Sequence, residues 1–130
     1  MVAIRSLALL GLSTLPFTQA WLLEFWASQV RCSKDGDGIK ADTERGGVAG
    51  KGYCAMISLD GGPKAMKISE WDDGCKVSVY AGSSPCTGEP VWERFKEEMA
   101  EAGRLVDNDW TCVIGLEGMS ITSAEYNCED

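Results

Sequence analysis

The six cysteines are the residues of this chain whose type and spacing point most clearly to a chemistry, the formation of disulfide bonds. An even number of cysteines in a short chain is typical of a disulfide framework, and such frameworks form in oxidising, extracellular compartments. None of the spacings is the Cys-x2-Cys of a zinc site, and the chain has no histidine to complete one. The cysteines predicted to form disulfides are Cys32, Cys54, Cys75, Cys86, Cys112 and Cys128.

The absence of histidine also removes the usual general base at neutral pH and the Ser-His and Cys-His nucleophile pairs. Pairs of carboxylates could still hydrolyse glycosidic bonds. The chain has 20 acidic residues, so some such pair is inevitable and carries no information. We therefore expect no catalytic residue, no cofactor and no enzymatic activity.

One segment, from Ser33 to Glu44, is close to the calcium-binding loop of an EF-hand. Asp35 and Asp37 stand at ligand positions of that loop. Ser33, however, replaces the first Asp ligand, Lys40 stands where an apolar residue is usual, and a glycine-rich stretch follows instead of a helix. We predict no metal ligand here, and a calcium titration of the loop 33–52 would test this.

Five tryptophans could form a binding surface, because exposed aromatic rings stack on sugars and anchor protein partners. Trp26, Trp71 and Trp110 lie at equivalent positions of predicted strands, where we expect them to pack in the core. Trp21 and Trp92 lie outside this pattern. They are predicted to be exposed and are the candidate surface-binding residues.

The first twenty residues have the features of a secretory signal peptide. Arg5 precedes an apolar run at 7–15, and small residues at 18–20 form a cleavage site. The apolar run is shorter than the roughly 20 residues that span a bilayer. We predict that residues 1–20 are removed and that residues 21–130 form a single secreted domain.

The charge of this mature domain bears on its partners. Removal of Arg5 leaves 11 basic and 20 acidic residues, a net charge of −9. A negative surface repels phosphate backbones and anionic lipids. We expect no nucleic-acid partner, no membrane insertion after cleavage, and a monomer that binds an unidentified extracellular protein or glycan.

Alternation of apolar and polar residues predicts a mainly β domain. The clearest case is the stretch 75–80, where Val77 and Val79 share one face. Apolar residues at helical spacing after Pro90 predict one amphipathic helix at 90–102. Further strands are expected at 21–32, 53–59, 64–71, 110–116 and 119–126, with a long loop at 33–52 and a hairpin-type turn at 72–74.

The chain is also predicted to contain an internal repeat, with halves at 21–75 and 76–130. Each half has three cysteines in matching places, and the aromatic residue, Ala and Cys of 26–32 return at 80–86. Two similar units that share one core are the usual physical meaning of such repetition. We therefore expect a disulfide-stabilised antiparallel β sandwich of Greek-key type.

The repeat suggests a connectivity for the cysteines, although sequence alone leaves 15 pairings open. A local bridge between Cys75 and Cys86 is the main alternative. The suggested pairs are Cys32 with Cys54, Cys86 with Cys112, and Cys75 with Cys128.

The aromatic strand, the Gly/Ser turn and the segment Cys86-Thr-Gly88 resemble the small cysteine-rich secreted proteins of filamentous ascomycete fungi, many of which are treated as effector candidates. The resemblance rests on cysteine spacing and carries no catalytic residue. It implies a non-enzymatic protein that binds a host or competitor macromolecule. The alternatives are a carbohydrate- or cell-wall-binding module, and a small toxin or enzyme inhibitor that presents the loop 81–89 or the loop 33–52.

A weaker resemblance connects the two halves with the Greek-key units of βγ-crystallin-like domains. The signature of those units is an aromatic residue followed seven positions later by glycine, but Tyr80 and Gly88 are one position further apart. The segment 107–112 ends in Thr-Cys instead of Ser-Ser. These departures speak against calcium binding of the crystallin type.

Overall fold

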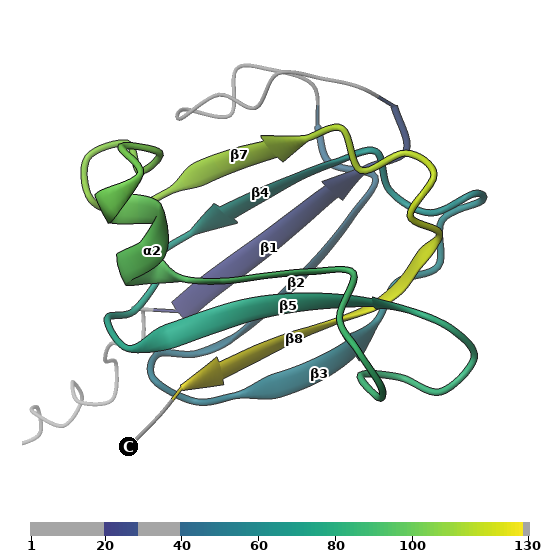
Figure 1. Cartoon of the computed structure of the whole chain (residues 1–130), viewed down its shortest axis with the longest axis horizontal. Helices are drawn as coiled ribbons and strands as arrows, with labels where there is room; N and C mark the ends of the chain where they lie inside the picture. The colour runs from purple at the N-terminus through teal and green to yellow at the C-terminus, as the bar shows by residue number, and fades with distance from the viewer. Residues whose placement is uncertain (1–19, 29–39, 129–130) are drawn as a thin grey trace, which may run out of the picture.

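The computed structural model describes residues 20–28 and 40–128 (Figure 1). The predicted signal peptide, apart from Ala20, and Cys32 lie outside the described residues. The described elements are β1 (Ala20–Trp26), β2 (Thr43–Val48), β3 (Tyr53–Met56), β4 (Ala65–Ser69), β5 (Cys75–Ala81), β6 (Trp92–Phe95), α2 (Lys96–Glu101), β7 (Thr111–Ile114) and β8 (Ile121–Cys128).

The strands form two four-stranded antiparallel sheets with the orders β2-β1-β4-β7 and β3-β8-β5-β6. The order repeats between the halves of the chain. Replacing each strand of the first sheet by its equivalent in the other half gives β6-β5-β8-β3, which is the second sheet read from its other end. Each half thus gives its third strand, β3 or β7, to the sheet of the other half. The predicted sandwich of two similar halves is confirmed.

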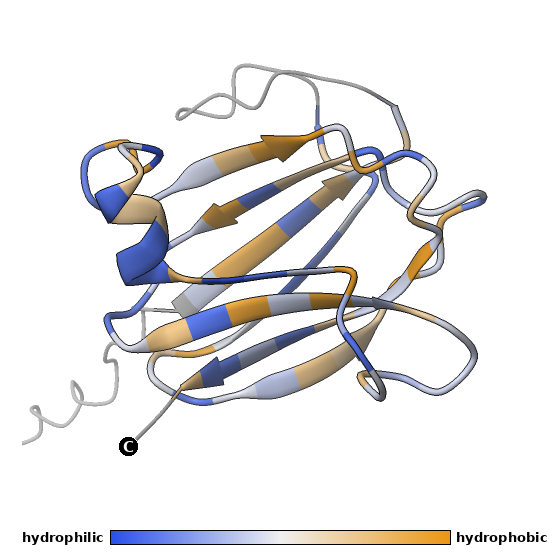
Figure 2. Ribbon diagram, in the orientation of Figure 1, coloured by the Kyte–Doolittle hydropathy of each residue, from blue (hydrophilic) through white to orange (hydrophobic). Residues whose placement is uncertain are grey.

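The core lies between the sheets, and the strands alternate between apolar and polar residues where one face meets it (Figure 2). Leu23, Phe25 and Ile68 come from the first sheet, whereas Val77 and Tyr126 come from the second; all five are at most 1% exposed. Because the third strands are exchanged, neither half could bury its apolar face alone. This explains why the two halves share one core.

The predicted helix at 90–102 is wrong in its first part. Residues 92–95 form β6, which pairs with β5, and the helix spans only Lys96–Glu101. Pairing with the edge of an existing sheet overrides the helical spacing of the apolar residues. The carboxylate of Glu98 accepts the backbone N–H of Phe95 at 2.7 Å and thereby caps the helix start.

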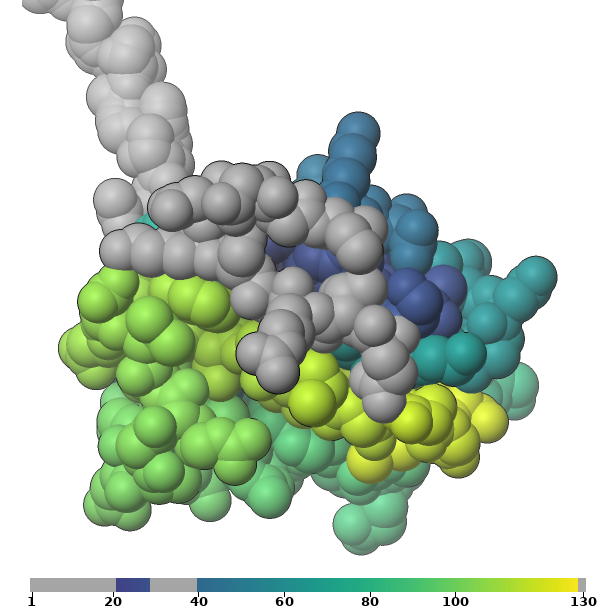
Figure 3. Space-filling model, turned by 90° about the horizontal axis from the view of Figure 1, so that it is seen from above, coloured from purple at the N-terminus to yellow at the C-terminus, as the bar shows by residue number. Residues whose placement is uncertain are grey.

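Seen from the side of β7, the segment around α2 forms one end of the molecule (Figure 3). Lys96 is buried, and its ammonium lies 2.9 Å from a carboxylate oxygen of Asp73. Glu97 accepts a hydrogen bond from the backbone N–H of Gly74. The helix therefore rests on the connection between the two halves. Among the described residues no helix is long and apolar enough to cross a membrane.

Two further predictions need correction. The expected loop at 33–52 contains β2, which pairs with β1. Its glycines are needed there, since a Cβ atom at Gly47 would lie 2.5 Å from the indole of Trp21. The segment 72–74 is not a hairpin turn, because it carries the chain from β4 in one sheet to β5 in the other.

Candidate functional site

The connection between β5 and β6 contains a loop, residues 82–90, that protrudes beyond the sheets (Figure 1). Most of its residues are exposed; Cys86 and Pro90 are half-buried. The loop has a single charged residue, Glu89, and three hydroxyl side chains. It therefore offers hydrogen-bonding groups and backbone to a partner, with little charge to desolvate.

A disulfide attaches this loop to the second sheet. Cys86 is bonded to Cys54 on β3. The suggested pairs Cys32–Cys54 and Cys86–Cys112 are wrong, as is the alternative Cys75–Cys86. The reason is the exchange of third strands: β3 belongs to the first half of the chain but lies in the sheet of the second half, beside the loop that carries Cys86.

Hydrogen bonds hold the loop at further points. The backbone N–H of Cys86 donates to the hydroxyl of Ser123 at 2.9 Å, and the Thr122 hydroxyl donates to the carbonyl of Gly82 at 2.6 Å. Within the loop, the Thr87 hydroxyl donates to the carbonyl of Ser84 at 3.0 Å. Cys86 itself has a φ of 51°, which an L-residue adopts only when its surroundings impose it. The loop is therefore ordered before any partner arrives.

A row of polar side chains crosses the outer face of the same sheet. Ser78 lies directly between Glu93 on β6 and Glu125 on β8. Its hydroxyl donates to Glu93 at 2.7 Å, and the neighbouring Tyr80 hydroxyl donates to Glu125 at 3.0 Å. Lys76 lies 3.2 Å from Glu93. Sequence reasoning missed this row, although the alternation along 75–80 places Lys76, Ser78 and Tyr80 on one face.

The ionisation of this row follows from its contacts. The Ser78 hydroxyl lowers the pKa of Glu93, and Lys76 adds to the effect against the opposing effect of burial. Burial and the carboxylate of Glu125 raise the pKa of Tyr80. Both shifts keep each group in its ordinary state at neutral pH. The row supports the sheet below the loop and supplies no poised acid or base.

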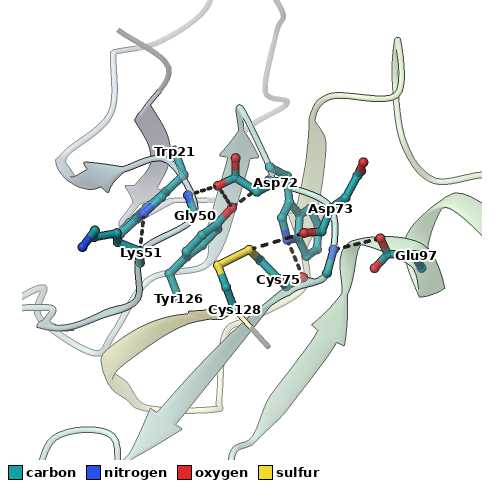
Figure 4. The surroundings of a disulfide bond; sticks show 11 residues. Trp21, Gly50, Lys51, Asp72, Asp73, Cys75, Glu97, Tyr126 and Cys128 are labelled. Atoms are coloured by element: carbon teal, nitrogen blue, oxygen red, sulfur yellow. Dashed lines mark hydrogen bonds between the residues drawn. A yellow bond between two sulfur atoms is a disulfide. The ribbon is translucent and has the colours of Figure 1, made fainter. Parts of the chain in front are cut away.

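The predicted pair of Cys75 and Cys128 is confirmed, and it lies in a different setting (Figure 4). Cys75 is buried in the core. Beside it, the Tyr126 hydroxyl donates to a carboxylate oxygen of Asp72 at 2.8 Å and accepts the Asp72 backbone N–H at 2.7 Å. Burial raises the pKa of Tyr126 strongly. This bridge therefore belongs to the packed junction between the halves.

Trp21 is part of the same junction, so the prediction that it is exposed is wrong. Its indole is 1% exposed and stacks on Tyr126 with ring centroids 4.3 Å apart. The indole N–H donates to the carbonyl of Lys51 at 2.9 Å. Sequence reasoning missed this position because Trp21 stands at the predicted cleavage site, outside the repeat pattern.

The other tryptophans offer no flat, open aromatic platform. Trp26 and Trp71 are buried as predicted, whereas Trp110, also predicted in the core, is half-buried. Trp92 is half-buried and packs partly against the core, with the Arg94 guanidinium 5.7 Å from its ring. Trp92 is therefore only partly accessible as a surface-binding residue.

The described residues also bear on metal binding. Asp72, Cys75 and Cys128 offer atoms that lie within 4.8 Å of one another, but both sulfur atoms are consumed by the disulfide. Of the EF-hand-like segment, the proposed ligands Asp35 and Asp37 lie outside the described residues, and Glu44 is exposed on β2. The prediction of no metal ligand stays a prediction for that segment.

No protein-family model, no curated protein and no solved structure matches this chain. The site must therefore be interpreted from its own geometry. What distinguishes it is an exposed loop of nearly uncharged residues, attached to a sheet by one disulfide and two side-chain hydroxyls.

Proposed function

We propose that this chain is a secreted, non-enzymatic protein that binds an extracellular macromolecule through the loop 82–90. One observation carries the proposal: the loop is exposed and yet held in one conformation by the Cys54–Cys86 disulfide. A loop that is ordered in advance loses little conformational entropy on binding. Disulfide bonds support an oxidising, extracellular location.

The resemblance to small cysteine-rich secreted proteins of ascomycete fungi would make the partner a host or competitor macromolecule. The weaker resemblance connects the two halves of the chain with βγ-crystallin-like domains. Both resemblances stay predictions. They bear on the origin of the fold and on the kind of partner. The binding role proposed for the loop 82–90 rests on the contacts of that loop.

Site-specific photo-crosslinking tests the proposal. A photoreactive residue at Ser84 would lie on the loop, and one at Glu101 would also be exposed but would lie on α2. The secreted protein is illuminated with extracellular fluid and wall material of a candidate host. We expect one dominant adduct from the Ser84 position that disappears when unlabelled protein competes. Adducts from both positions alike, or none from Ser84, would contradict the proposal.

An enzyme inhibitor is the second candidate, because inhibitory loops are also held in advance by disulfides. The exposed segment Ser83-Ser84-Pro85 is the part that would enter a protease cleft. A panel of extracellular proteases, assayed with the native protein and with a Cys54→Ser/Cys86→Ser variant, would test it. Inhibition that depends on the disulfide would support this form of the proposal.

A carbohydrate-binding module is supported less well. Such modules stack sugars on exposed aromatic rings, but Trp21 is buried and Trp92 packs partly against the core. Binding to chitin or glucan that survives changes in the loop would favour this alternative over the proposal.

A further inference from the structure

The strand β3 is an open edge of the second sheet. It stands at the end of the order β3-β8-β5-β6 and so pairs on one side only. From residue 52 to residue 59 it carries no charged side chain. Tyr53 is 57% exposed and Met56 49% exposed. An uncharged, apolar edge strand is a template for pairing with another strand.

Two of the three other edge strands among the described residues carry charges that β3 lacks. β2 carries Glu44 and Arg45, and β6 carries Glu93 and Arg94. Charged side chains on an edge oppose pairing with a second sheet. β7 is uncharged like β3 and therefore provides the control edge for the test of β3.

The backbone of β3 determines which residues can pair. Ile57, directly after β3, donates its N–H to the carbonyl of Thr122 on the neighbouring strand β8 at 2.8 Å. Because hydrogen-bonding groups alternate along a strand, Cys54 and Met56 direct their N–H and C=O groups to the free edge. Two such residues on each of two antiparallel strands are enough for a short ladder.

We propose that two copies of this chain associate through β3, forming one continuous sheet across a two-fold axis. Antiparallel pairing that satisfies the free groups places Cys54 opposite Met56 of the second copy and Ala55 opposite its own equivalent. The small side chain of Ala55 leaves room at the axis. An interface of this kind is self-complementary, as two-fold symmetry requires.

Charges at the ends of the strand fit this arrangement. Lys51 precedes β3 and Asp60 follows it, and both are exposed. Antiparallel pairing brings Lys51 of one copy toward Asp60 of the other, twice in the dimer. Met56 then lies against Cys54 of the second copy and covers an exposed disulfide. A flexible thioether side chain is well suited to that contact.

The inference does not rest on the proposed function, because it uses the edge of β3 and not the loop. It revises the expectation of a monomer. The two loops 82–90 of the dimer would each be attached beside the interface through Cys54, and a partner with repeated sites could engage both. The interface is small, so the association is expected to be weak and dependent on concentration.

Sedimentation equilibrium of the mature protein tests the proposal, from micromolar to millimolar concentration at physiological salt. The wild type should shift from the mass of one copy toward that of two as concentration rises. Met56→Lys places a charge on the pairing edge and should remain at the mass of one copy. Ile114→Lys, at the equivalent exposed position of β7, should behave like the wild type.

Circular dichroism of both variants should match the wild type, since both positions are exposed and changes there leave the core intact. A wild type that stays at the mass of one copy throughout would overturn the proposal. So would a dimer that Ile114→Lys disrupts and Met56→Lys does not. A second measurement is hydrogen exchange: the amides of Cys54 and Met56 should exchange more slowly at millimolar than at micromolar protein.

Discussion

The two described disulfides join elements in opposite settings. Cys75–Cys128 connects residues that are directly opposite on neighbouring strands, and Cys75 is 1% exposed. Cys54–Cys86 connects an edge strand to a protruding loop, and Cys54 is exposed. Both bridges close long segments, 53 and 32 residues, so their effects on the unfolded chain are similar. Their effects on the folded state must differ.

The two bridges therefore have different roles, one in the fold and one in the proposed binding loop. The Cys75–Cys128 bridge, here called the inner bridge, lies beside Tyr126 and Asp72, where the two halves meet (Figure 4). The Cys54–Cys86 bridge, here called the outer bridge, contributes little buried surface, but it determines the shape of the loop 82–90. We therefore expect changes at the inner bridge to affect stability first, and changes at the outer bridge to affect binding first.

The largest effect is expected from removing the inner bridge. Replacing Cys75 and Cys128 together by Ala should lower the free energy of unfolding by about 5 kcal/mol, near the upper end for small secreted domains. The reason is that the change frees the unfolded chain and also leaves space in the core. Urea denaturation monitored by fluorescence measures it. A loss below about 1 kcal/mol would show that the junction does not depend on this bridge.

Trp21→Ala should come next, with a loss of about 4 kcal/mol, because it removes a fully buried indole and its stack on Tyr126. Trp92→Ala is the matched control and should cost less than half as much, since Trp92 is only half-buried. Equal losses for the two variants would mean that Trp21 does not pack at the junction.

The outer bridge should have a smaller effect on stability. Replacing Cys54 and Cys86 by Ser should cost about 3 kcal/mol, because the change acts through the unfolded chain alone. Amide exchange in β4 and β5 should accelerate only by the factor that the lower free energy of unfolding accounts for, whereas amides of the loop 82–90 should lose the additional protection that the bridge gives them in the folded state. If the loop amides of the folded protein exchange as they do in the wild type, the bridge does not order the loop and the contrast between the bridges fails.

Tyr126→Phe removes the two hydrogen bonds to Asp72 and should cost about 1–2 kcal/mol at neutral pH. The pKa of Tyr126 in the folded protein is raised above the ordinary value of 10.0, chiefly by burial. Its contribution is therefore present below about pH 10 and is lost as pH rises above that value. Alkaline denaturation should be less steep for the variant than for the wild type. Identical alkaline profiles would contradict the burial of this hydroxyl.

The smallest effect is expected at Glu93, whose side chain is 38% exposed. Its pKa is lowered, chiefly by the Ser78 hydroxyl, so its contribution is present above about pH 4.5 and is lost as pH falls below it. Glu93→Gln should change the stability at neutral pH by less than about 0.5 kcal/mol. Stability measured from pH 3 to 7 should fall less steeply for the variant.

Much of the fold could be predicted from the sequence. The alternation of Val77 and Val79 with polar residues located β5, and the matching cysteines indicated two similar halves. The first signal is local to one strand, and the second depends on the similarity of two distant segments of the chain. The strand β2 was missed because its glycines carry no apolar pattern. Gly47 is explained only by the indole of Trp21 from another strand.

The site could be predicted less well, because it depends on which strands are neighbours. A pattern of cysteines does not reveal that β3 lies in the sheet of the other half, and the bridge Cys54–Cys86 follows from that exchange. The same applies to the row of Glu93, Ser78 and Glu125, which come from three strands. Short-range patterns place each residue on a face but do not identify its neighbour across the sheet.

The repeat extends the observed pairing to one further bridge. Cys112 on β7 is also disulfide-bonded, and β7 is the equivalent of β3. The equivalent of the Cys54–Cys86 bridge in the other half joins Cys112 to Cys32. We therefore predict Cys32 as the partner of Cys112, although Cys32 lies outside the described residues.

Peptide mapping of the protein without reduction, by mass spectrometry, tests the exchanged sandwich most directly. The structure predicts linked peptides that contain Cys54 with Cys86 and Cys75 with Cys128, and the repeat adds Cys32 with Cys112. The same map reports whether the chain begins at Trp21. A link between Cys86 and either Cys75 or Cys112 would contradict the exchange of third strands, and with it the disulfide that holds the loop 82–90.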